Sequence, residues 1–75
     1  MNYIIVETQT SGNTTAVLNF VENDYFEAMG KYFDKCAAAA RSNVELHAVS
    51  LITENGAPVA NKHEAFYHTP IETEE

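Results

Sequence analysis

The sequence predicts an α+β fold in which four strands and one helix follow one another in the order ββαββ. An amphipathic helical pattern covers residues 24–41, with two strand-like segments before it and two after it. Turn residues join the strand segments in pairs, which indicates two hairpins. The 75 residues have room for one domain. We place it at residues 1–68 and expect a disordered acidic C-terminal tail at 69–75.

The first hairpin is predicted from residues 2–10 and 14–21. Residues 2–10 are rich in β-branched and aromatic side chains and alternate in character, as expected of a strand. Gly12 and Asn13 both tolerate a positive φ and predict the turn. The returning segment should place Ala16, Leu18 and Phe20 on one face of the sheet and Thr15, Val17 and Val21 on the other.

The helix is predicted from a capping pattern and an apolar stripe. Asp24 followed three residues later by Glu27 resembles a capping box, and Asn23 is the alternative cap. Arg41 in the last turn suits the helix dipole. Gly30 should cost about 1 kcal/mol relative to alanine, and we expect it to let the helix approach the sheet closely. The stripe consists of Tyr25, Ala28, Met29, Tyr32, Phe33, Cys36, Ala37 and Ala40.

The second hairpin is predicted from residues 44–53 and 57–68, joined by an Asn-Gly step at Asn55 and Gly56. The later segment is the more polar, and Pro58 near its start marks it as an edge strand. The earlier segment should carry Leu46, Ala48 and Ile52 on one face and His47, Val49 and Leu51 on the other.

Two segments, residues 4–6 and 44–52, are apolar on both faces and should therefore be the central strands. This arrangement gives an antiparallel sheet in the order 2-1-3-4, with a different strand order as the alternative. One helix covers one face only, so a partner is expected on the other face. A second copy is the simplest partner, and a different protein or a small ligand is the alternative. The interface residues expected from either sheet face are Ile4, Val6, Val49, Leu51 and Phe66.

Composition narrows the classes of function. The net charge is −7, from 11 acidic and 4 basic residues, and such a field repels DNA and RNA. Cys36 is the only cysteine, so no internal disulfide can form. We see no signal peptide and no apolar run of membrane-spanning length, and we expect a cytoplasmic protein without membrane association.

No catalytic, cofactor or metal signature stands out, so enzymatic activity is not expected. His63 and His68 are five residues apart and should lie on opposite faces of their strand. His47 interrupts an apolar run, so it should be buried with a hydrogen-bond partner or lie at an interface. Cys36 belongs to the helix stripe and should be buried. The candidate ligand-binding residues, taken from the hydroxyl-rich first turn and the central histidine, are Thr10, Ser11, Asn13, Thr14 and His47.

Three stretches of the chain carry a resemblance to a known family. They are TQTSGNTTAV at 8–17, AAAA at 37–40, and VELHAVSL at 44–51, which leads to ENG at 54–56. In these stretches the chain resembles a family of small, mostly uncharacterised proteins of gut bacteria and their prophages. The resemblance implies a phage or prophage origin without an assigned activity. A prophage setting favours small proteins that interfere with host defence.

The sequence thus predicts a non-enzymatic binding protein that acts as a homo-oligomer. In a prophage setting it would interfere with a host-defence process by sequestering a host protein or a signalling nucleotide. Two alternatives stay open at this stage. The chain could be an acidic inhibitor that occupies the nucleic-acid groove of an enzyme, as anti-CRISPR proteins do. It could also bind a small molecule or a nucleotide outside host defence.

Overall fold

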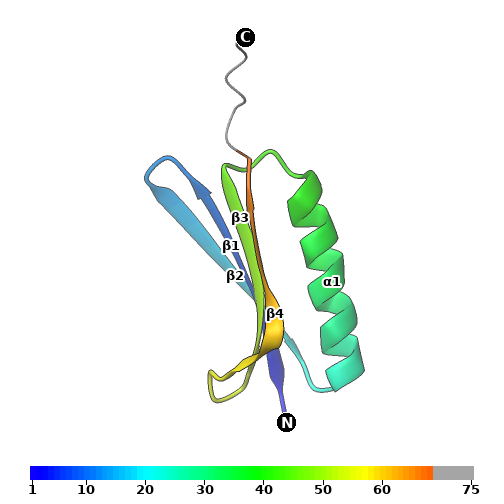
Figure 1. Ribbon diagram of the computed structural model, residues 1–75. Coiled ribbons are helices and arrows are strands. Elements are labelled where there is room, and N and C mark those ends of the chain that lie inside the picture. The colour runs from blue at the N-terminus through cyan, green and yellow to red at the C-terminus, as the bar shows by residue number, and fades with distance from the viewer. Residues whose placement is uncertain (69–75) are drawn as a thin grey trace.

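The computed structural model describes residues 1–68 and has the predicted element order (Figure 1). The four strands form one antiparallel sheet in the order β2-β1-β3-β4, which confirms the predicted topology. The acidic tail predicted at 69–75 lies outside the described residues. The elements are β1 (Tyr3–Ser11), β2 (Thr14–Glu22), α1 (Tyr25–Arg41), β3 (Leu46–Thr53) and β4 (Pro58–Tyr67).

The first hairpin closes through a two-residue turn. Ser11 pairs with Thr14, and Gly12 and Asn13 make the turn between them. Gly12 has a φ of 60°. Asn13 does not have a positive φ. A positive φ at the first central position alone is the mark of a type II′ turn, whose twist matches that of the flanking strands. The turn therefore fixes the register of all nine β1–β2 pairs, from Ser11 and Thr14 to Tyr3 and Glu22.

The N-terminus of α1 is capped by Asp24 rather than by its rival Asn23. The Asp24 carboxylate accepts a hydrogen bond of 2.9 Å from the backbone N–H of Glu27. This bond satisfies one of the N–H groups that the first turn of any helix leaves free. At the other end, the backbone N–H of Ser42 donates to the carbonyl of Ala39 at 3.3 Å and ends the helix.

The helix packs on the sheet with a narrower face than the predicted stripe, and this face also includes Ala39. Ala28, Tyr32 and Ala39 are buried, and Met29 and Cys36 are packed against the core. Four residues predicted to belong to this face are exposed: Tyr25, Phe33, Ala37 and Ala40, with Phe33 54% exposed. The prediction was wrong for these four because the apolar stripe is wider than the strip of helix that a flat sheet can contact.

The core lies between α1 and the face of the sheet that carries the odd-numbered residues of β1 and β3. Ile5 on β1 and Val49 and Leu51 on β3 are fully buried there, together with Ala28, Tyr32 and Ala39 of α1. Directly paired residues of neighbouring strands point to the same side of a sheet. The register therefore assigns every strand residue outside the β4 irregularity either to the α1 side or to the opposite side.

Gly30 does not serve the close approach of the helix to the sheet that we expected. A Cβ atom at this position would meet no atom within 4 Å. Gly30→Ala should therefore raise the free energy of unfolding by about 1 kcal/mol, because alanine is the better helix former. Urea denaturation followed by circular dichroism measures this change. Gly12→Ala is the matched control and should destabilise, because φ is positive at Gly12. A Gly30→Ala variant without any gain would contradict the prediction.

Candidate functional site

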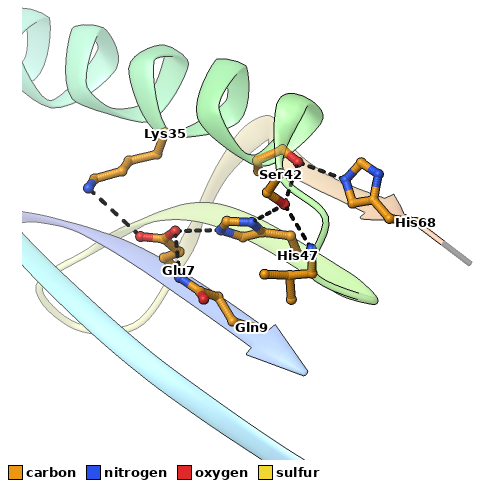
Figure 2. A network of polar contacts seen from close by, with 8 residues as sticks. Glu7, Gln9, Lys35, Ser42, His47 and His68 are labelled. Carbon is orange, nitrogen blue, oxygen red and sulfur yellow. Dashed lines mark hydrogen bonds and ion pairs between the residues drawn. The ribbon is translucent and has the colours of Figure 1, made fainter. Parts of the chain in front are cut away.

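A buried polar network lies between the C-terminal half of α1 and the sheet (Figure 2). Its centre is Glu7 on β1 and His47 on β3, which are 6% and 4% exposed in an otherwise apolar core. The Glu7 carboxylate accepts a hydrogen bond from Nε2 of His47. The prediction that His47 is buried with a hydrogen-bond partner is thus confirmed. Burying a carboxylate is costly unless it is paired, so the neighbouring groups matter.

Glu7 has two further partners. Nε2 of Gln9, two residues along β1, donates to the carboxylate at 3.2 Å. Nζ of Lys35, from α1, lies 3.8 Å from the other carboxylate oxygen. The same ammonium group lies 4.1 Å from the centre of the Phe20 ring, a cation–π distance. The negative charge of Glu7 is therefore compensated within the core by groups from β1, β3 and α1.

The network continues from His47 to the end of the helix. Nδ1 of His47 lies 2.9 Å from Oγ of Ser42, and this hydroxyl lies 3.1 Å from the carbonyl oxygen of Ala39. The N–H of Val44 donates to Ser42 Oγ at 3.4 Å, and Nε2 of His68 donates to the Ala39 carbonyl at 2.8 Å. Donors thus gather at the negative end of the helix dipole and join α1, β3 and the residue after β4.

Ser42, His47 and Glu7 follow the order hydroxyl, imidazole and carboxylate, which is also that of a hydrolytic triad. The surroundings of the hydroxyl favour a structural role. Ser42 Oγ is already in contact with a backbone carbonyl and a backbone N–H, and no pocket opens beside it within residues 1–68. A nucleophile needs room for a substrate at hydrogen-bond distance. The arrangement is suited to clamp the end of α1 onto β1 and β3.

Two further polar groups lie under α1. Cys36 is packed against the core but is partly exposed, and burial raises the pKa of its thiol. At neutral pH the thiolate, which is the reactive form, is therefore scarce. Burial likewise raises the pKa of Tyr32, whose hydroxyl has no hydrogen-bond partner among the described residues. Neither group has the environment of an activated nucleophile.

The sheet face opposite α1 consists of four rows of paired residues, each crossing all four strands. None of these sixteen residues is Asp, Glu, Lys or Arg. From β2 to β4, the rows are Val21, Ile4, Ile52 and Pro58; Asn19, Val6, Ser50 and His63; Val17, Thr8, Ala48 and Ala65; and Thr15, Thr10, Leu46 and Tyr67. We call this surface the open face.

No described residue covers the open face, because α1 lies wholly on the other side of the sheet (Figure 1). The outer strands leave their side chains there largely in water. Val17 is 57% exposed, Val21 60% and Tyr67 72%. The row that runs through Ile4 and Ile52 is apolar in every strand. An apolar surface of this kind is a candidate binding surface.

The structure divides the five predicted interface residues between the two faces. Ile4 and Val6 lie on the open face, as an interface requires. Val49 and Leu51 lie beneath α1 and are fully buried, and Phe66 is packed against the same core. The prediction was wrong for these last three, because the sheet register places them on the side that the helix covers.

The five predicted ligand-binding residues do not form one site. Ser11, Asn13 and Thr14 are exposed at the tip of the first hairpin. Thr10 lies on the open face, whereas His47 is buried on the α1 side of the sheet. Residues that are close in sequence around a tight turn point in different directions, so the shared polar character of this segment did not indicate a shared site.

The structure places the remaining histidines as predicted. His63 lies on the open face, hydrogen-bonded to Ser50, and His68 lies on the α1 side. Within residues 1–68, no group of three or more His, Cys, Asp or Glu side chains could hold a metal ion. Glu7 and Ser42 were not predicted from the sequence. Glu7 is two residues from the apolar Ile5, so the two side chains share a face of the strand, and this spacing was the available signal that Glu7 could be buried.

In the described part of the chain, no helix is long and apolar enough to cross a membrane. Comparisons of the sequence with protein-family models and with curated proteins give no match, and a comparison with solved structures gives none either. The resemblance to small prophage proteins, and the host-defence setting that it implies, therefore stay predictions.

Proposed function

We propose that the protein is a non-enzymatic binding protein that works as a homo-oligomer assembled through its open face. The observation that carries this proposal is the absence of Asp, Glu, Lys and Arg from the sixteen residues of that face. The chain as a whole has 11 acidic and 4 basic residues. Charged residues are depleted at the centres of protein–protein interfaces, whereas a sheet face in water normally carries them.

The area of the open face is compatible with a dimer. Strands about 4.8 Å apart and a rise of about 3.3 Å per residue give roughly 500 Å² for four strands of eight residues. Two copies would bury roughly 1,000 Å², which is near the lower limit for a specific interface. Two sheets packed face to face in this way form a sandwich. We therefore expect reversible association that depends on protein concentration.

The proposed role of the assembled protein is to capture a partner rather than to catalyse a reaction. The hydroxyl of Ser42 is already hydrogen-bonded, and residues 1–68 form no pocket beside it; both observations support this choice. In the prophage setting that the sequence resemblance implies, the captured partner would be a host protein or a signalling nucleotide. Its capture would interfere with a host-defence process.

Light scattering coupled to size-exclusion chromatography tests the assembly at protein concentrations from micromolar to millimolar. We expect the wild type to be larger than a monomer of 8.3 kDa. Tyr67→Lys places a charge on the open face at a side chain that is already 72% exposed, and it should dissociate this contact without unfolding the chain. Ala38→Lys adds the same charge on the exposed surface of α1 and should leave the mass unchanged. A wild type that stays monomeric throughout, or equal masses for both variants, would refute the proposal.

A further inference from the structure

The two edges of the sheet differ in their protection against pairing with another strand. On β4, Pro58 lacks a backbone N–H, Asn61 has a φ of 61°, and Lys62 adds a charge. The pairing of β4 with β3 is also irregular between Ser50 and Ile52. Proline, lysine and bulges are the devices with which natural proteins block an edge strand. The β4 edge is therefore protected.

The β2 edge has none of these devices. It runs for nine residues without proline, lysine or arginine, and it pairs with β1 without a register shift. Its only charged residue is Glu22, at its end, where Lys31 lies 3.5 Å from the carboxylate. Apolar side chains are exposed on both of its faces, with Val17 at 57% and Leu18 at 39%. A long, regular and apolar edge of this kind readily pairs with another strand.

The hairpin turn determines which backbone groups of β2 are free. In a two-residue hairpin, the pair that closes the turn exchanges both hydrogen bonds, and so does every second pair after it. The closing pair is Ser11 and Thr14. The N–H and C=O groups that point away from β1 therefore belong to Thr15, Val17, Asn19 and Val21. The helix does not cover this edge, because α1 packs mainly on β3 (Figure 1).

We propose that the β2 strands of two copies pair antiparallel around a two-fold axis at Leu18, giving one continuous sheet of eight strands. In this register the free backbone groups of Val17 meet those of Asn19 of the second copy. Both copies contribute the same strand, β2, to this pairing, as a two-fold interface requires. The edge contact is made by backbone groups of β2, whereas the open-face contact is made by side chains, so neither contact depends on the other.

The sequence of β2 favours a second copy as the occupant. Around Leu18, the bulky Phe20 of one copy lies opposite the small Ala16 of the other. The single carboxylate, Glu22, lies opposite Thr14, so no like charges face each other. For a chain of net charge −7, an edge whose only charge is compensated by Lys31 is a surface on which two copies can approach each other.

Asn19→Pro tests the edge contact. The N–H of Asn19 points away from β1, so proline removes a group needed for pairing with the second copy and none of the hydrogen bonds within the hairpin. We expect the molar mass of the wild-type assembly to fall by half in this variant, with an unchanged circular dichroism spectrum. Asn19→Ala keeps the N–H and should behave as the wild type. Equal masses for the two variants would overturn the proposal.

A disulfide provides a second test that does not rely on proline. In a Cys36→Ser background, Leu18→Cys places two thiols across the axis at a pair without hydrogen bonds, where the Cα atoms are about 4.5 Å apart and a disulfide can form. Mild oxidation should then give a covalent dimer at least ten times faster than in the Val21→Cys control, whose thiols would lie apart. Equal rates would overturn the proposal.

The two proposals can fail separately. If both contacts form, the wild type is a tetramer, and Tyr67→Lys and Asn19→Pro each reduce it to a dimer. If only the edge contact forms, the wild type is a dimer that Asn19→Pro dissociates and Tyr67→Lys does not. If only the open-face contact forms, the wild type is a dimer that Tyr67→Lys dissociates and Asn19→Pro does not. This outcome refutes the edge proposal.

Discussion

His47→Ala is expected to lower the free energy of unfolding by about 3–5 kcal/mol. The substitution leaves the Glu7 carboxylate buried without its imidazole partner, and it also removes the link from the sheet to Ser42 at the end of α1. The core of a domain this small supplies only about 3–5 kcal/mol. The variant should therefore be largely unfolded at 25 °C, which urea denaturation followed by circular dichroism would show.

The double variant Glu7→Leu with His47→Leu separates the value of the pair from the cost of leaving one partner alone. Replacing both partners of a buried hydrogen bond with apolar groups of similar shape is often nearly neutral or stabilising. We expect the double variant to be at least about 2 kcal/mol more stable than His47→Ala. The single variant keeps a buried carboxylate that has lost its imidazole donor and retains only Gln9 and Lys35 as partners. In the double variant Lys35, whose side chain is partly exposed, can turn to water. Equal losses in the single and double variants would show that the network acts through packing alone.

Tyr32→Ala should cost about 3–5 kcal/mol, a loss of the same size. Tyr32 is 1% exposed and is the largest fully buried side chain of the core, so its truncation leaves a cavity between α1 and the sheet. The cost includes the lost burial and the contacts that the cavity walls no longer make. Thermal unfolding measured by calorimetry is a suitable readout, and the midpoint should fall by more than 10 °C.

Tyr32→Phe is the matched control, because it keeps the ring and removes the hydroxyl alone. That hydroxyl is buried without a hydrogen-bond partner among the described residues. A buried donor without a partner costs about 1–3 kcal/mol. Tyr32→Phe should thus equal the wild type in stability or exceed it. A loss of more than about 1 kcal/mol would contradict this and reveal a partner for the hydroxyl.

Local chemistry made the order of the elements predictable. Gly12 and Gly56 mark the two hairpin turns and Asp24 marks the start of α1, and all three have the predicted roles in the structure. The strand order also followed from the sequence, because the two segments that are most apolar on both faces, residues 4–6 and 44–52, were expected at the centre of the sheet. The turn and capping signals depend only on neighbouring residues, so they do not depend on how the rest of the chain packs.

The assignment of faces could not be predicted in the same way. In β1, Ile4 and Ile5 are equally apolar, yet only Ile5 faces α1. The alternation along a strand fixes which residues share a face, but packing of the helix decides which face is buried. Because the helix packs on this face, Glu7 is buried, and Val49 and Leu51 lie in the core rather than at an interface. Glu7 was missed because nothing within its own strand indicates that His47 and Lys35 will surround it.

The central pair of strands has a consequence for how the chain folds. β1 and β3 belong to different hairpins, and the hydrogen bond between Glu7 and His47 spans 40 residues of sequence. A two-stranded hairpin alone is marginally stable in water. Until β3 pairs with β1, the N-terminal hairpin has only α1 to pack against, and its central strand lacks one neighbour. Folding is thus expected to be a single cooperative step whose rate is limited by closing this long loop.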